Sequence, residues 1–308
     1  MKEPSYNISA VERDTGLSKD VLRVWERRYG FPLPERDAHG ERAYPASQVE
    51  RLRLVKRLMD QGHRPGKLLG LDTEALAHLA PRRSAAPLDT GERVASAALD
   101  GLLDFIRQHD AAGFQQALQQ RLAREGLQRL VVETVAPLTR RVGEAWEQGG
   151  IQVFEEHLFT ELTERLLRQA IGALPSTRQP PRVLLTSVAE EPHALGLLMV
   201  EALLSLEGAD CIPLGTQLPL QDIARAAAAH RADVVALSFS SAYTPRRIGP
   251  VLQQLHELLP GGTAVWAGGG GVRQASLPEA TRRIGSLEQG IEELLRWRSQ
   301  HRGPAAAA

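Results

Sequence analysis

The chain has 308 residues, 43% of them hydrophobic and 24% charged, and its formal net charge is zero; this length admits two or three domains, and any nucleic-acid binding must come from a local basic patch. No apolar stretch approaches the ~18–20 uncharged residues of a membrane span, and the N-terminus lacks a signal-peptide core, so we expect a cytoplasmic protein without membrane contact. The one cysteine, Cys211, excludes an internal disulfide and a zinc cluster made of cysteines.

The first predicted elements are two short helices. Ser9 and Glu12 form a capping-box pattern, which predicts a helix that ends in a turn at Thr15-Gly16. Ser18 is placed to cap a second helix, Lys19–Arg28, with a basic face. Two short helices joined by a Gly-containing turn are typical of a helix-turn-helix, whose second helix enters the major groove of DNA. A small helical hairpin with a solvated basic face is the alternative.

A wing and a long helix are expected next. Pro32-Leu33-Pro34 ends the second helix, Arg36–Tyr44 has the composition of a hairpin wing, and Ser47 is placed to cap a long basic helix. The segment from Tyr6 to about Leu71 resembles the MerR family of winged-helix transcription regulators. Two stretches carry this resemblance by their order and spacing: Val24-Trp25-Glu26-Arg27-Arg28-Tyr29-Gly30 and Gly40-Glu41-Arg42-Ala43-Tyr44.

The MerR resemblance implies how this segment would bind operator double-stranded DNA. MerR proteins bind palindromes as dimers, usually through a coiled coil that follows the winged helix. No sustained heptad series follows here, so we expect another part of the chain to bring subunits together. The recognition helix would read the major groove, and wing contacts to phosphates would position the protein without specifying sequence. The implied DNA-binding residues are Lys19, Arg23, Arg27 and Arg28 on the helix, and Arg42 and Tyr44 on the wing.

The middle of the chain reads as a linker followed by helices. Residues 80–91 are rich in Ala, Pro, Arg and Ser, which is typical of a flexible linker after a winged-helix domain at 1–79. Apolar residues then recur at helical intervals over residues 92–176, with breaks at Asp110 and Gly149-Gly150. The pattern predicts a four-helix bundle.

Strand-like and helical runs alternate in the last part of the chain. This alternation predicts a parallel sheet with helices on both faces, a Rossmann-like (flavodoxin-like) domain at residues 177–302 that precedes a disordered tail at 303–308. The fold class is therefore multidomain, α and α/β. The expected strands cover residues 182–188, 210–214, 234–240 and 263–267, and the expected helices 196–207, 220–230, 245–259 and 287–300.

The loop after the first of these strands carries a candidate metal ligand. His193 follows the strand directly, at the carboxyl edge where open α/β sheets bind ligands. A neutral imidazole there can bind a metal through one nitrogen, and Glu191 can fix the tautomer through the other. A loop histidine bonded to backbone is the ordinary alternative.

Small residues close two more strands, at Ser238-Phe239-Ser240 and at Gly268-Gly269-Gly270-Gly271. With Glu191, His193 and Gly196 they resemble the cobalamin-binding domain, whose signature is Asp/Glu-x-His-x-x-Gly, then Ser-x-Ser/Thr/Leu, then Gly-Gly. The resemblance covers roughly Pro181 to Gln300. It implies that His193 binds cobalt from below in place of the benzimidazole base, and that Ser238, Ser240, Gly268 and Gly269 line the slot for the displaced nucleotide tail.

Trp146 and the pair Glu156-His157 stand out in the helical segment. A boundary tryptophan and a solvated Glu-His face are the ordinary interpretation. The spacing nevertheless resembles the Trp-x9-Glu-His motif of the light-sensing CarH/LitR group of MerR regulators. That resemblance implies that Trp146 packs against an adenosyl group, Glu156 bonds its ribose and His157 helps to close the upper pocket. Some members carry histidine directly after the tryptophan; this chain has Glu147, a poorer ligand for cobalt(III).

The expected function is a light-responsive transcriptional repressor, not an enzyme, that uses adenosylcobalamin. By resemblance it assembles in the dark, as a tetramer made of dimers, and light releases it from the operator by breaking the cobalt–carbon bond. One alternative is a MerR-type regulator that senses cobalamin, or another ligand such as haem on His193, without light. A second is a corrinoid-carrying subunit of a methyltransferase, which would have no use for the DNA-binding segment.

Overall fold

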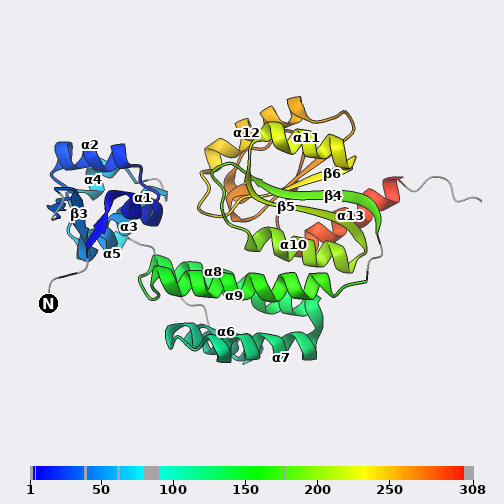
Figure 1. Ribbon diagram of the computed structural model, residues 1–308, viewed down its shortest axis with the longest axis horizontal. Helices are drawn as coiled ribbons and strands as arrows, with labels where there is room; N and C mark the ends of the chain where they lie inside the picture. The colour runs from blue at the N-terminus through cyan, green and yellow to red at the C-terminus, as the bar shows by residue number, and fades with distance from the viewer. Residues whose placement is uncertain are drawn as a thin grey trace, which may run out of the picture. The chain divides into compact units, whose positions relative to one another are not determined.

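The computed structural model describes residues 3, 5–37, 40–60, 63–79, 90–175 and 178–301. The predicted tail and most of the predicted linker lie outside this range; the described chain resumes with a helix at Thr90, inside the linker boundary. The chain divides into two compact units, residues 1–97 with 141–156 and residues 98–140 with 157–308. The helical segment therefore contributes to both units. The helices and some of the strands are labelled in Figure 1.

The N-terminal segment is a winged helix-turn-helix. Its described strands pair antiparallel in the order β1-β3-β2, so that β2 and β3 form the expected wing. The turn between them is closed at Asp37, which accepts from the Gly40 amide and donates to the Glu41 carbonyl. The elements are β1 (Ser5–Asn7), α1 (Ile8–Thr15), α2 (Lys19–Tyr29), β2 (Glu35–Arg36), β3 (Arg42–Pro45), α3 (Ala46–Asp60), α4 (Pro65–Leu68) and α5 (Thr73–Leu79).

Two of the predicted helix caps were wrong and one is confirmed. Asn7 caps α1, because its side chain accepts from the Ala10 amide at 2.8 Å, and Ser9 lies inside the helix. Ser47 lies inside α3, which begins one residue earlier. Ser18 caps α2 as expected, accepting from the amide of residue 21 at 3.3 Å.

Basic residues of α3 hold the winged-helix domain together. Arg51 donates to the carbonyls of Leu69 and Leu71 and stacks over the ring of Phe31, 4.2 Å from its centroid. Arg53 forms an ion pair with Asp14 of α1 at 2.7 Å. These cations fix α3 against its neighbours.

The helical segment follows the predicted breaks and adds two irregularities. Asp110 caps a helix by accepting from the Gly113 amide at 2.8 Å, and Gly149 follows a helix end with φ +72°. Gly126 kinks the second helix, with φ 78° and ψ 168°, and a π-helical turn, η1, follows. In a π-helical turn each backbone hydrogen bond joins residues five apart, in place of the four of an α-helix. The elements are α6 (Thr90–Arg107), α7 (Ala111–Arg129), η1 (Leu130–Val135), α8 (Ala136–Glu147) and α9 (Val153–Gly172).

Residues 178–301 fold into a five-stranded parallel sheet in the order β5-β4-β6-β7-β8. Helices α10 and α13 cover one face, and α11 and α12 cover the other (Figure 1). The first four strands and all four helices were predicted; β8 was missed. The elements are β4 (Gln179–Val188), α10 (Leu195–Leu206), β5 (Ala209–Leu218), α11 (Leu220–His230), β6 (Val234–Ser238), α12 (Pro245–Leu258), β7 (Ala264–Gly268), η2 (Gly270–Gln274), β8 (Thr281–Ile284) and α13 (Leu287–His301).

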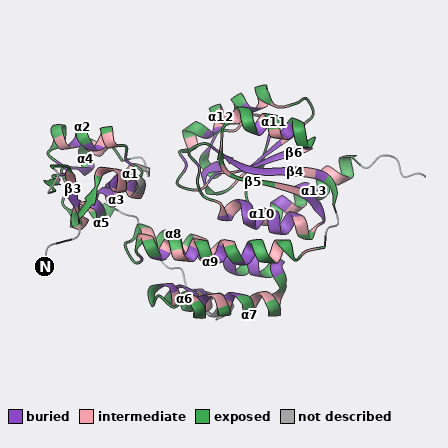
Figure 2. Cartoon of the chain, in the orientation of Figure 1, coloured by how far each residue is buried: buried purple, intermediate pink, exposed green. Residues whose placement is uncertain are grey.

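The strand order places a ligand-binding crevice at the end of β4. The chain leaves β4 toward β5 on one side and returns to β6 on the other, so the loops after β4 and β6 diverge. The central strands and α10 are buried on nearly every side (Figure 2). Helix α10 is apolar all round because it packs on the sheet and also contacts α7 and η1. The edge of the sheet beside His193 is therefore built on rigid, buried elements.

Candidate functional site

His193 lies on the short loop that joins β4 to α10. The loop leaves the buried strand through Glu190, which takes a left-handed φ of 72°, and the Glu191 amide donates back to the carbonyl of Val188 at 3.1 Å. Helix α10 begins two residues after His193, at Leu195. This tight turn presents the imidazole at the carboxyl edge of the sheet, where its side chain is 53% exposed.

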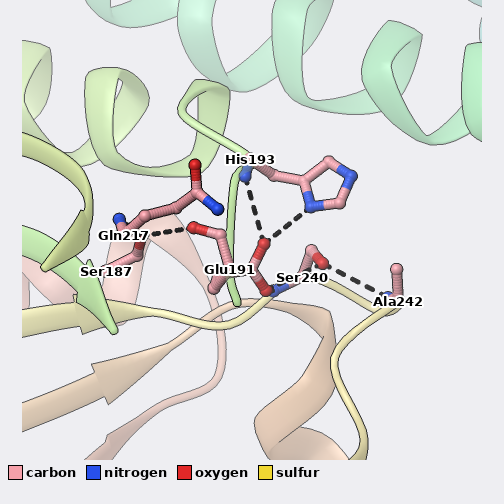
Figure 3. A network of polar contacts seen from close by, with 6 residues as sticks. All are labelled: Ser187, Glu191, His193, Gln217, Ser240 and Ala242. Atoms are coloured by element: carbon pink, nitrogen blue, oxygen red, sulfur yellow. Dashed lines mark hydrogen bonds and ion pairs between the residues drawn. The ribbon is translucent and has the colours of Figure 1, made fainter. Parts of the chain in front are cut away.

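Glu191 is the centre of a closed hydrogen-bond network (Figure 3). One carboxylate oxygen, Oε1, accepts from the His193 amide at 3.1 Å and contacts His193 Nδ1 at 2.6 Å. The other, Oε2, accepts from the Ser240 amide at 2.7 Å and from the Ser240 hydroxyl at 2.9 Å. The residue is 1% exposed. Burial alone would raise the pKa of Glu191, but the hydrogen bonds from His193 and Ser240 together outweigh it and hold that pKa below its ordinary value.

A carboxylate on Nδ1 fixes both the tautomer and the direction of the imidazole. Nδ1 carries the proton toward Glu191, so a bond to a metal would have to come from Nε2. Figure 3 shows the ring of His193 turned with Nε2 on the side away from Glu191. This donor pair fits an imidazole that would bind a metal through Nε2.

Ser187, which sequence reasoning missed, and Gln217, in a stretch expected to lie near the ligand, support the same loop. Ser187 is the residue before the last of the buried strand β4, and its hydroxyl donates to the backbone carbonyl of Glu191. Ser187 also accepts from the amide of Gln217, near the end of β5, at 3.0 Å. A hydroxyl inside a buried strand next to the strand end was the available signal, since buried hydroxyls are nearly always hydrogen-bonded.

The small residues at the strand ends lie on the same edge of the sheet. Ser238 pairs with Gly268 across β6 and β7. Gly196, in the first turn of α10, approaches Ser238 so closely that an added Cβ would lie 2.6 Å from its hydroxyl. Gly269 has φ +96°, and a Cβ there would lie 2.2 Å from the carbonyl of Phe239. The backbone thus requires glycine at 269, whereas a side chain at 196 would make the Ser238 hydroxyl rotate away. The role of these glycines toward a nucleotide tail remains a prediction.

The described residues include no group of three or more His, Cys, Asp or Glu side chains that could hold a metal ion. A metal bound by His193 would therefore need most of its ligands from elsewhere, as the four nitrogens of a corrin ring would supply. A shallow cavity of about 110 Å³ opens beside the imidazole, lined by Glu190, Pro192, Tyr243, Thr244 and Arg247 among others. Glu191, His193 and Ser240 line this cavity as well, so the hydrogen-bond network borders open space on this side.

The predicted upper-face residues lie on α8 and α9. Trp146 is half-buried near the end of α8, and Glu147, which ends that helix, is exposed. Glu156 is half-buried and His157 exposed in the first turns of α9, which starts at Val153. Their contacts with an adenosyl group remain predictions.

The predicted DNA-contacting residues divide into exposed and engaged side chains. Arg23, Arg27 and Arg28 are exposed on α2, and Lys19 is half-buried at its start. Arg42 on the wing donates to Glu26 of α2 at 2.9 and 3.5 Å, which ties the wing to the recognition helix.

Tyr44 corrects the sequence prediction. It is fully buried, with its ring in the core of the winged helix and its hydroxyl without a hydrogen-bond partner. A phosphate contact needs that hydroxyl at the surface, so the expected role was wrong for this structure. Strand β3 turns both residue 43 and Tyr44 inward, and the aromatic ring fills the space under α3.

Comparison with known proteins identifies the family. The HTH-type transcriptional repressor CarH of Myxococcus xanthus is 31% identical over 281 residues, which cover 89% of this chain and 91% of that protein. The chain belongs to the CarH/CarA group of MerR-family repressors. The HTH-type transcriptional repressor CarA of the same organism is 32% identical over 256 residues, 81% of each chain. Family models match as well: MerR HTH family regulatory protein at residues 6–68, and B12 binding domain at residues 98–171 and 181–287.

A solved structure agrees on the fold of the MerR-family repressor beyond its DNA-binding segment. The monomethylamine corrinoid protein of Methanosarcina barkeri superposes on 66% of this chain and 99% of its own, with a TM-score of 0.52 at 18% identity. The expected family and fold class are therefore confirmed. No helix among the described residues is long and apolar enough to span a membrane.

Proposed function

We propose that this MerR-family repressor is a light-responsive regulator that uses adenosylcobalamin, binds its operator in the dark as an oligomer, and leaves it on illumination. The observation that supports the proposal most directly is the contact of buried Glu191 with Nδ1 of His193. It prepares one neutral imidazole, through Nε2, as the lower ligand of a corrinoid cobalt. The chemistry that adenosylcobalamin supplies when bound is a cobalt–carbon bond that visible light breaks.

The residues of this chain have distinct roles in the proposal. His193 replaces the cofactor's own base, and Ser238, Gly268 and Gly269 face the displaced nucleotide tail at the strand ends. Ser240 acts through Glu191, to which it donates two hydrogen bonds. Ser187 holds the backbone of the same loop.

On the upper face, Trp146 packs on the adenosyl group, Glu156 bonds its ribose and His157 helps to close the pocket. Without that group Trp146 and Glu156 would lose these contacts, and the helical segment would be free to shift. A ligand-dependent shift of this kind is what a switch requires, because only contacts that differ between two states change their populations. Glu147 stands where some members of the group carry histidine, so His157 or water would have to bind the metal in its place.

Assembly connects the sensor to DNA. Three exposed cations, Arg23, Arg27 and Arg28, lie on α2, and we expect one winged helix to bind DNA weakly by itself. Several copies in one assembly bind together far more tightly, because the later contacts are intramolecular. Light that disperses a tetramer made of dimers therefore releases the operator.

The test is size-exclusion chromatography of the full chain with adenosylcobalamin, in the dark and after green light, with the visible spectrum of each peak. We expect a coloured larger species that becomes smaller on illumination. His193→Ala should lose dark assembly or bind the corrinoid more weakly, whereas His230→Ala, the same substitution at the exposed end of α11, should behave as wild type. A coloured species indifferent to light would instead indicate a cobalamin sensor or corrinoid carrier. Dark assembly and light response that survive His193→Ala would exclude the cobalt-ligand role.

A further inference from the structure

The exposed face of the recognition helix carries one apolar side chain among charges. Helix α2 buries Leu22 and Trp25 against the domain core. Its opposite face is exposed and is made of Asp20, Arg23, Val24, Arg27 and Arg28. Val24 lies one helical turn from Asp20 and from Arg27 or Arg28, at the i±3 and i±4 spacing of neighbours on a helix surface. It is 41% exposed.

The fold does not account for a valine at this position. Val24 is outside the hydrophobic core cluster of the winged helix and is not among the partly buried residues packed against it, unlike Val21 on the same helix. A β-branched residue also lowers the stability of a solvated helix relative to alanine, lysine or glutamate. Single exposed apolar residues are common, but this one occupies the face that a helix-turn-helix inserts into DNA.

We propose that Val24 reads the C5 methyl group of a thymine in each operator half-site; the inference rests on DNA binding by the proposed repressor. The major groove presents one apolar group, the thymine methyl, among hydrogen-bond donors and acceptors. Arg23, Arg27 and Arg28 supply the cations for phosphates and guanine edges, which a valine cannot bind. A short, stiff apolar side chain between them suits a methyl contact, because Val24 has few rotamers to lose on binding.

The neighbouring charges limit where the contact can form. Asp20 is 89% exposed at its side chain and forms an ion pair with Arg23 at 3.3 Å. A carboxylate is repelled by phosphates and accepts only from cytosine or adenine amino groups. In this proposal the first turn of α2 would face base edges, and Val24 lies one turn later on the same exposed face.

The test removes the methyl from DNA and the side chain from the protein. The full chain, with adenosylcobalamin in the dark, selects a duplex from a randomised library, and deoxyuridine then replaces each thymine of that duplex in turn. Deoxyuridine keeps every hydrogen-bonding group and deletes only the methyl. Wild type should lose affinity about fourfold at one thymine of a half-site, the value expected for exposing one buried methyl group. Val24→Ala should bind the two duplexes equally at that position.

Val21→Ala is the matched control, since it is the same substitution in the same helix on the side facing the core. It should keep the full fourfold preference for thymine, even if it folds less stably. Equal deoxyuridine sensitivity in wild type and Val24→Ala, or no sensitive thymine in wild type, would overturn the methyl-reading role alone. A chain that selects no DNA in the dark or in the light would overturn both this role and the proposed repressor function.

Discussion

Glu191→Gln is the most informative single substitution, because it keeps the shape of the side chain and removes its charge. The carboxylate accepts two hydrogen bonds from His193 and two from Ser240. A glutamine offers one oxygen, and its NH₂ group would face the donors of either His193 or Ser240. Two of the four bonds are therefore lost or strained. Because hydrogen bonds to a buried charge contribute about 1.5–3 kcal/mol each, and the Ser240 hydroxyl can turn to accept, the local cost is about 2–3 kcal/mol.

The measurement must be local, because a chain of several domains does not unfold in one step. Amide hydrogen exchange of the segments that contain His193 and Ser240 reports the opening of this network alone. We expect protection there to fall roughly 30- to 150-fold in Glu191→Gln, the ratio that corresponds to about 2–3 kcal/mol. Titration with adenosylcobalamin in the dark should show roughly 10- to 100-fold weaker binding, as for other residues that orient a metal ligand.

The neighbouring carboxylate provides the control. Glu190 pairs with Arg247 at the surface, and both side chains are 56% exposed. Exposed pairs contribute about 0–1 kcal/mol, so Glu190→Gln should leave the hydrogen exchange of these segments close to wild type. If Glu191→Gln behaved like this control, the carboxylate would not orient His193 and the reasoning from the network would be refuted.

Three further outcomes are expected. The pKa of Glu191 is depressed in the folded chain. Its contribution to the stability of the network is therefore complete above the ordinary carboxyl pKa and is lost as pH falls through the depressed value. The difference in hydrogen exchange between wild type and Glu191→Gln should thus shrink only in acid, below about pH 4.5. Tyr44→Phe removes a buried, unpaired hydroxyl. Thermal unfolding should therefore be unchanged or shift to higher stability by about 1 kcal/mol, and DNA affinity should be unchanged. A weaker salt dependence of DNA binding in this variant would instead show that the Tyr44 hydroxyl contacts a phosphate. Gly269→Ala places a Cβ 2.2 Å from the Phe239 carbonyl at φ +96°, and should cost more than about 3 kcal/mol in unfolding measurements or prevent folding, whereas equal stability would contradict the packing.

The sequence predicts the α/β domain well because β4, β6 and β7 are apolar runs that alternate with helical patterns. Strand β8 was missed for the opposite reason: Thr281-Arg282-Arg283-Ile284 is short and half charged. It forms the edge of the sheet, paired only with β7 among the described strands. An edge strand exposes one side to water and does not need the apolar run that identifies a central strand.

The sequence prediction was wrong in the winged helix where two nearby residues could serve the same local role. Asn7 and Ser9 are both good cap residues two positions apart, and only the pairing of β1 with β3 decides that the helix starts after Asn7. The burial of Tyr44 likewise depends on which face of β3 meets α3. A four-residue strand contains too few positions for its alternation to show that face.

Long-range contacts change the meaning of one predicted motif. In the chain, Glu191-x-His193 and Ser238-x-Ser240 are separate signals, the first for a metal ligand and the second for a ligand slot. In the fold, both hydrogen atoms that Ser240 can donate point to Oε2 of Glu191. Ser240 is thus committed to holding the carboxylate, while Ser238 faces Gly196 and the strand end. The two serines belong to different parts of the site, since one acts on the imidazole through Glu191 and the other borders the crevice. No local pattern could separate them, because the partner of Ser240 lies 49 residues away along the chain.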